Sequence, residues 1–261
     1  MAGIPVRLHY LFFVTLLLPM FFQAWVSWIG VLWAFVIFGP VLFVTILLHE
    51  LGHCLATRQV GGDVHGILLW PLGGLAFVGH AGSPARDLYV AVCGPLTHIP
   101  QFAAWYLMLV LSRRGITGAW SPSLAMLDAS QQFWLAVCVG ACQVNLALMA
   151  FNLLLPAYPL DGGRIFADLM LLCGVPALLA AKVTVGVAIT IGIAIIAFGA
   201  IYFNVITMIV GVWMLISTFE LFQAIRTDTI KQHPMFYFEP AAAQNDPMVM
   251  LPANHPRSAG V

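Results

Sequence analysis

The pentapeptide His49-Glu50-Leu51-Gly52-His53 places two imidazoles and one carboxylate within little more than one helical turn. Residues four apart lie on the same face of a helix, so His49 and His53 can bind one zinc ion together. Glu50 lies next to the first of these ligands, where it can act as a general base on a nearby water molecule. The pentapeptide therefore indicates a zinc site that activates water.

The surroundings of this pentapeptide are apolar. Residues 31–57 form a run longer than the roughly 20 residues that a helix needs to cross a bilayer. A carboxylate at bilayer depth costs about 2.5–3.5 kcal/mol on insertion scales, and Glu50 is the only acidic residue in the first two predicted spans. Ionisable groups at such depth are functional by default, which favours catalysis over the alternative, a His–Glu hydrogen-bond network that holds helices together.

A catalytic zinc ion takes three protein ligands and leaves one position open for water. We prefer Asp161 as the third ligand, because two prolines break the helix before it and two glycines after it permit unusual backbone. Its alternative role is to cap the N-terminus of a short apolar helix at 165–173. The histidines that remain possible as third ligands are His9, His65, His80 and His98.

The composition is that of a membrane protein. Hydrophobic residues make up 62% of the 261 residues and charged residues only 8%, whereas a soluble domain has about 25% charged residues. Most of the surface must therefore face the lipid bilayer. The net charge is zero and no basic run occurs, so we expect no nucleic-acid partner. The five cysteines lie in or beside apolar segments, and their odd number argues against disulfides and a disulfide-linked partner.

We expect an all-α polytopic membrane protein with about six transmembrane helices. Residues 58–85, between the second and third spans, are rich in glycine and contain two short apolar runs, which predicts a membrane-associated hairpin or re-entrant loop. Residues 1–225 would form one membrane-embedded core, and 226–261 a short, flexible cytoplasmic tail. The predicted spans are 8–28, 31–57, 87–111, 131–155, 176–198 and 200–223.

The charge distribution predicts the orientation of the chain. Six spans would place both termini on one side, and the first apolar run is interpreted as a retained span instead of a removed signal peptide. The other side holds only Arg113 and Arg114. Basic residues concentrate on the cytoplasmic side of membrane proteins, so the termini are expected to be cytoplasmic. The basic residues on the side of the termini are Arg7, Arg58, Arg86, Arg164, Arg226, Lys231 and Arg257.

Five segments of the chain carry motifs in an order typical of one protease family: 4–10, 49–53, 70–76, 93–95 and 152–163. On these motifs, nearly the whole chain resembles the site-2 proteases, which are intramembrane zinc metalloproteases. It looks closest to their six-span branch, without the PDZ and CBS domains that many members carry. The resemblance implies hydrolysis of peptide bonds in or near transmembrane segments of membrane-protein substrates, with one Zn²⁺ per chain and Asp161 as third ligand.

The resemblance also implies that Asn152 forms hydrogen bonds to the substrate or the transition state. One extra leucine separates Asn152 from Pro156, which on a regular helix would turn the amide by about 100°. Asn145, two turns earlier, is the alternative. His98 departs from the pattern of the family, and we interpret it as a polar group in helix packing.

In the mechanism that these residues imply, Glu50 takes a proton from water and returns it to the leaving amine. A helical substrate must unwind first, and its extended stretch can then add as a strand to the hairpin around Gly73 and Gly74; the alternative is a simple connecting hairpin. A zinc or proton transporter could line its path with the same residues, but paired broken helices in related halves are not evident. A third alternative is an inactive relative of these proteases that binds membrane partners without cutting them. The intact His49–His53 motif and Asp161 argue against it.

Overall fold

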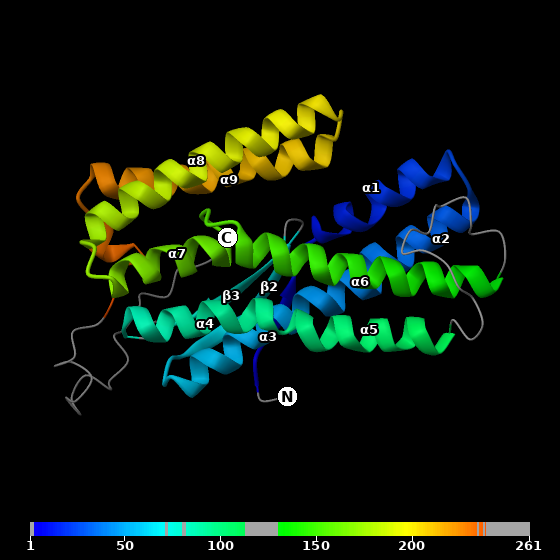
Figure 1. The fold of residues 1–261 in the computed structure, drawn as a ribbon, viewed down its shortest axis with the longest axis horizontal. Coiled ribbons are helices and arrows are strands. Elements are labelled where there is room, and N and C mark those ends of the chain that lie inside the picture. Colours follow the sequence, from blue (N-terminus) through cyan, green and yellow to red (C-terminus); the bar gives the residue numbers. More distant parts are fainter. Residues whose placement is uncertain are drawn as a thin grey trace, which may run out of the picture.

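The structure is a computed structural model that describes residues 3–70, 73–79, 82–112, 130–233, 235–236 and 238. It is predominantly helical, which confirms the predicted fold class, and it contains one sheet of three strands (Figure 1). The strands are β1 Val6–Leu8, β2 Val64–Trp70 and β3 Gly73–Val78. The α-helices are α1 Phe12–Ala24, α2 Trp28–Val36, α3 Leu42–Gln59, α4 Pro84–Leu96, α5 His98–Ser112, α6 Ser130–Leu154, α7 Asp161–Leu172, α8 Ala177–Ile201 and α9 Val205–Arg226.

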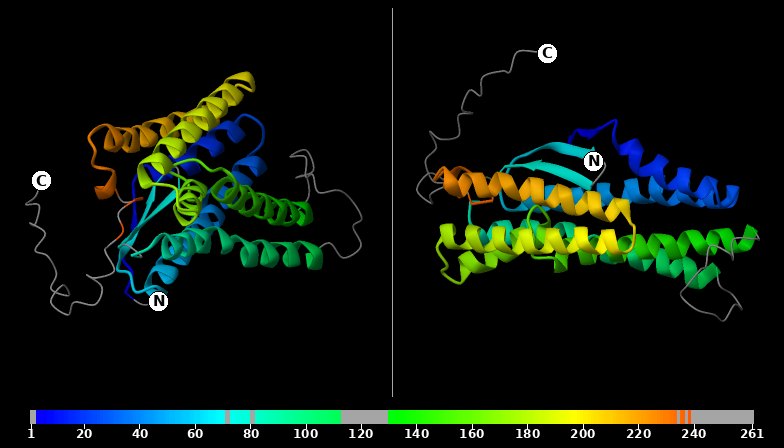
Figure 2. Two further views of the ribbon diagram at one scale, coloured as in Figure 1. Left: turned by 60° about the vertical axis from the view of Figure 1, so that its left-hand side comes forward. Right: turned by 90° about the horizontal axis from the view of Figure 1, so that it is seen from above.

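The long helices run close to one common direction, and the sheet lies at one side of the bundle (Figure 2). Among the described residues, four helices are long and apolar enough to cross a membrane, by length and composition. Two of the six predicted spans correspond to shorter helices. The first is α1, with 13 residues. The third is divided at Thr97 into α4 and α5, where Pro95 and Pro100 remove backbone donors. The number of six spans stays a prediction. The four helices lie at Trp28–Gln59, Phe133–Leu154, Ala177–Ile201 and Val205–Arg226.

The helix that carries the histidine pair contains a wide turn before the pair. Between α2 and α3, the residues Ile37–Val41 form a π-helical turn that includes Pro40. Such a turn changes the face that the following residues present. Ile37 and Val41 are buried against Val137 and Ala141 of α6, so this turn anchors the start of α3 in the bundle.

The segment predicted as a hairpin or re-entrant loop contains an antiparallel pair of strands, β2 and β3, with Trp70 paired to Gly73. Its position relative to a membrane stays a prediction. The sequence did not predict β1, which pairs in parallel with β2. In the sheet order β1-β2-β3, strand β3 has a second edge without a strand partner in the described part of the chain. The buried residues Ile67 and Leu69 fasten the sheet to α3.

Part of the predicted tail packs on the helices. Ile230, Met235 and Phe236 are at most 5% exposed and belong to one apolar cluster with Ala181 of α8 and Leu221 of α9. The packed core therefore extends beyond the boundary expected at 225. Residues 239–261 of the predicted tail lie outside the described residues.

Helices α8 and α9 approach each other closely at glycines. A Cβ atom built on Gly211 would lie 2.6 Å from Cγ1 of Ile196 and 2.9 Å from the carbonyl oxygen of Gly192. Close backbone contact of this kind stabilises helix pairs in membranes. Gly186, also on α8, offers a contrast, because no described atom lies within 4 Å of its Cβ position.

We expect Gly211→Ala to lower the free energy of unfolding by roughly 1–3 kcal/mol, because the added methyl group must push the two helices apart. The matched variant Gly186→Ala should be neutral, or more stable by up to about 1 kcal/mol, since alanine favours the helix. Thermal unfolding in detergent measures both variants. Equal melting temperatures for the two would contradict the close packing of α8 on α9.

Candidate metal centre

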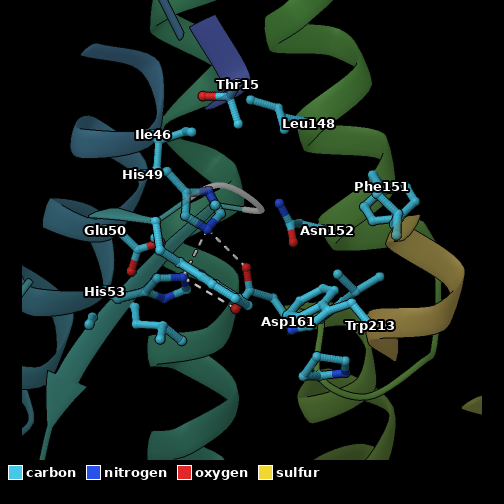
Figure 3. A pocket seen from close by; sticks show the side chains of 18 of the residues that line it. Thr15, Ile46, His49, Glu50, His53, Leu148, Phe151, Asn152, Asp161 and Trp213 are labelled. Atoms are coloured by element: carbon cyan, nitrogen blue, oxygen red, sulfur yellow. Dashed lines mark hydrogen bonds and ion pairs between the residues drawn. The ribbon is translucent and has the colours of Figure 1, made fainter. Parts of the chain in front are cut away.

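His49 and His53 from α3 meet Asp161, the first residue of α7, in the interior of the protein (Figure 3). The Nε2 atoms of the two histidines are 3.2 Å apart. Asp161 Oδ2 lies 3.1 Å from His49 Nε2, and Asp161 Oδ1 lies 3.3 Å from His53 Nε2. The structure thus brings together the three residues that the sequence predicted as zinc ligands.

These distances fit a small divalent cation. Four ligands at 2.0–2.1 Å from a zinc ion in tetrahedral geometry are about 3.3 Å from each other. The shortest separations between the three residues are 3.1 to 3.3 Å, with a different oxygen of Asp161 facing each histidine. Asp161 Oδ2 is also buried without a hydrogen-bond partner among the described residues, which is costly for a carboxylate oxygen unless a cation compensates it. The donor set, two imidazoles and one carboxylate, is one that zinc prefers.

The outer nitrogens of both imidazoles have partners within the protein. His53 Nδ1 is 2.8 Å from the carbonyl oxygen of Val90 on α4. A carbonyl can only accept a hydrogen bond, so His53 Nδ1 carries the proton and Nε2 keeps a free lone pair. His49 Nδ1 is 3.1 Å from Nε2 of His98. Such outer partners orient metal-binding histidines and fix their tautomers.

The backbone around Asp161 depends on the two glycines that follow it. A Cβ atom on Gly162 would lie 2.2 Å from the carbonyl oxygen of Leu155, and one on Gly163 would lie 2.5 Å from the carbonyl carbon of Ala157. Only glycine permits this close return of the chain after α6. The capping alternative is wrong, because α7 begins at Asp161 itself and not at residue 165.

Glu50 is 5% exposed and lies under strand β3. A Cβ atom on Gly74 would lie 2.3 Å from Cγ of Glu50, so a glycine is required where the strand crosses the carboxylate. The backbone of Ala76 forms a hydrogen bond with the same carboxylate. Figure 3 shows Glu50 and Asp161 on opposite sides of the histidine pair, and both acids line one cavity.

This cavity has a volume of about 830 Å³ and is mostly apolar, with walls from α1, α3, α6, α9 and β3. Gly73, Gly74 and Asn152 line it together with the three candidate ligands. Figure 3 shows the Asn152 amide directed toward the space between His49 and Asp161. The extra leucine therefore does not turn Asn152 away, because α6 ends two residues later and the chain leaves helical geometry. Asn145 is fully buried behind His98 and is not among the residues that line the cavity.

An ion pair near the site was not predicted from the sequence. Arg164, one turn after Asp161 on α7, pairs with Asp87 of α4. Asp87 is 4% exposed. Neither residue stands out in the sequence, because each has another charged residue within four positions, and only the packing of α4 on α7 shows that the two residues meet.

Comparisons with known proteins agree with this geometry. The family model described as Peptidase family M50 matches residues 37–198. The zinc metalloprotease MJ0392 of Methanocaldococcus jannaschii is 28% identical over 232 residues, which are 87% of this chain and 60% of that protein. Stage IV sporulation protein FB of Bacillus subtilis is 32% identical over 127 residues, which are 48% of this chain and 37% of that protein.

Among solved structures, the site-2 protease from Methanocaldococcus jannaschii has the same fold, with a TM-score of 0.57 and 24% identity. The match covers 84% of this chain and 91% of that chain. By contrast, the matched part of this chain spans 60% and 37% of the full lengths of the two curated relatives.

Helix α4 is close enough to the candidate ligands that one methyl group can test the geometry. A Cβ atom on Gly94 would lie 2.1 Å from Nε2 of His53, and the buried imidazole has little room to move. We expect Gly94→Ala to displace His53 and to weaken zinc binding at least about 10-fold.

Metal analysis and chelator competition on purified protein measure this effect, with Gly186→Ala as the control glycine variant. A zinc affinity of Gly94→Ala equal to that of the unmodified chain would show that the imidazole at 53 does not bind the metal in this position.

Proposed function

This chain belongs to peptidase family M50, and on that basis we propose that it is an intramembrane zinc metalloprotease. Its substrates would be membrane proteins, cut at peptide bonds in or near their transmembrane segments. The observation that carries the proposal is the meeting of His49, His53 and Asp161 within 3.3 Å of one another, in a cavity of an integral membrane protein.

In this proposal one zinc ion per chain would be held by the Nε2 atoms of His49 and His53 and by the carboxylate of Asp161. Zinc bound there would supply Lewis-acid chemistry: it lowers the pKa of water toward 7 and polarises a carbonyl group. The aspartate contributes one negative charge, and the two neutral imidazoles contribute lone pairs. The cavity beside these three residues would hold the reacting water and the substrate.

Glu50 is assigned as the general base. It takes a proton from the attacking water and delivers it to the leaving amine. Two features support the assignment: the carboxylate lines the cavity beside the candidate ligands, and the backbone of Ala76 fixes its orientation. Strand β3 covers it from one side, so the carboxylate is shielded there by protein.

The cavity also suggests how a substrate binds. Its apolar walls suit an apolar segment, and the unpaired edge of β3 at Gly73 and Gly74 is suited to pair with an extended backbone. The Asn152 amide, directed into the same space, would form hydrogen bonds with the substrate or the transition state. A transmembrane protein in the bilayer is therefore the proposed partner.

We further propose that both termini are cytoplasmic and that the segment 226–261, part of which packs on α8 and α9, lies on that side of the membrane. The support is the excess of basic residues on the side of the termini. Reporter fusions at each end of the chain test this orientation. A terminus located on the opposite side of the membrane would refute it.

We expect Glu50→Gln to keep its zinc ion and to lower the rate of proteolysis roughly 10²–10⁴-fold, because the amide cannot take up the proton. Asp161→Asn should lose zinc as well as activity. The measurements are zinc stoichiometry and cleavage of a transmembrane reporter peptide in proteoliposomes. Glu220→Gln, on the exposed face of α9, is the matched control and should cleave at the unmodified rate.

Two results would contradict the proposed function. Unchanged cleavage by Glu50→Gln would remove Glu50 as the base. Zinc flux through the unmodified chain in the same proteoliposomes, without any cleavage, would favour a transporter that uses the same residues.

A further inference from the structure

We propose that His98 is a positioning residue of the metal site, which acts with Asn145 to keep a proton on Nδ1 of His49 and so leaves His49 Nε2 free for zinc. The inference rests on the proposed function, because it assigns a role toward the zinc ion. It concerns two residues that are not themselves ligands.

The three residues form one buried chain of hydrogen bonds across three helices. His49 Nδ1 on α3 is 3.1 Å from His98 Nε2 on α5. His98 Nδ1 is 3.1 Å from Asn145 Oδ1 on α6. The chain ends where Asn145 Nδ2 donates to the carbonyl oxygen of Ala141 at 3.0 Å. His98 is 1% exposed and Asn145 is fully buried, so water does not compete for these groups.

The last bond fixes the direction of all the others. The carbonyl of Ala141 can only accept, so the Asn145 NH₂ group points toward it and Oδ1 points toward His98. Since Oδ1 can only accept, His98 must donate from Nδ1, and a neutral imidazole then accepts at Nε2. His49 must in turn donate from Nδ1. Its remaining nitrogen, Nε2, is left with the lone pair that a metal requires.

Two other roles for His98 agree less well with this geometry. As a zinc ligand it would have to direct a free nitrogen at the metal, but both of its nitrogens have partners in this chain of bonds. As a general packing group it would not need a defined tautomer. The interpretation from sequence, a polar group in helix packing, therefore describes its location and not the whole of its role.

The matching arrangement at His53 supports this view. There the outer nitrogen meets the carbonyl oxygen of Val90 directly at 2.8 Å, and one bond is enough to fix the tautomer. At His49 the partner of Nδ1 is a side chain, His98, in place of a backbone carbonyl. The Ala141 carbonyl orients the Asn145 amide, Asn145 sets the tautomer of His98, and His98 then accepts the hydrogen bond from His49 Nδ1. Both histidines thus receive a fixed proton on Nδ1, one directly and one through two side chains.

The test compares variants of the full-length chain in detergent. His98→Leu removes the acceptor for His49 Nδ1, whereas His98→Gln retains an acceptor oxygen near the position of Nε2. Asn145→Leu removes the group that fixes His98. Leu109→Ala is the matched control, because Leu109 is buried on α5 but packs against Cys138 and Val139, away from these bonds. Zinc affinity is measured by chelator competition, and tautomers by ¹⁵N-histidine NMR.

We expect His98→Leu to lose zinc affinity by about 10–100-fold and His98→Gln to retain most of it. Leu109→Ala should lower only the melting temperature. In the unmodified chain, NMR should find the His98 proton on Nδ1, and Asn145→Leu should redistribute it between both nitrogens. Asn145→Leu keeps the test usable if His98→Leu does not fold.

Three results would overturn the proposal: unmodified zinc affinity in His98→Leu, an equal loss in His98→Leu and His98→Gln, or a His98 proton located on Nε2. Failure of the proposed function is distinct from these, since it is detected in the unmodified chain, by the absence of bound zinc or of reporter cleavage, and not by a difference between the variants at positions 98 and 145.

Discussion

The close approach of two buried imidazoles and one carboxylate that is 12% exposed is the interaction on which the rest of the structure depends. Three atoms with lone pairs directed at one point repel each other unless a cation or protons lie between them. The cost is higher in a membrane protein, where little water can enter to compensate. The fold must therefore hold His49, His53 and Asp161 in place, and much of the local sequence serves this purpose.

Glycines let the backbone of neighbouring elements approach the side chains of the site. Gly94 lets α4 pack directly against the imidazole of His53, and Gly74 lets β3 cross over Glu50. Gly162 and Gly163 let the chain return after α6, so that α7 begins with Asp161 at the site. At each position a side chain would occupy space that the site needs. Polar anchors complete the arrangement: the Val90 carbonyl at His53, and the Arg164–Asp87 pair between α7 and α4.

The sequence predicted the parts of this site that depend on local pattern. The spacing of His49 and His53, the acid between them and the break in the helix before Asp161 were enough to predict three candidate ligands and a candidate base. The hairpin followed from its glycines and short apolar runs. Contacts between distant helices were not predictable in the same way. The bonds from His98 to His49 and Asn145, and the ion pair of Arg164, depend on packing angles that no single segment encodes.

The same reasoning explains the differences in the fold. Strand β1 was missed because three residues before a long apolar run carry little period-2 signal, and β2 provides its pairing. The third predicted span is divided at Thr97 because hydropathy counts Pro95 and Pro100 as acceptable residues, although each lacks a backbone donor. Mean hydropathy predicts whether a segment faces lipid or water, but it does not take into account whether the backbone hydrogen bonds of a continuous helix can form.

The residues after α9 have a practical consequence for shortened versions of the protein. Met235 and Phe236 cover Leu221 and the alanines of α8 from the end of the bundle, and Ile230 packs beside them. A truncation immediately after Arg226 would expose this apolar surface and remove the closing contact of the α8–α9 pair. A shortened chain or a fused affinity tag should therefore retain the residues through Phe238.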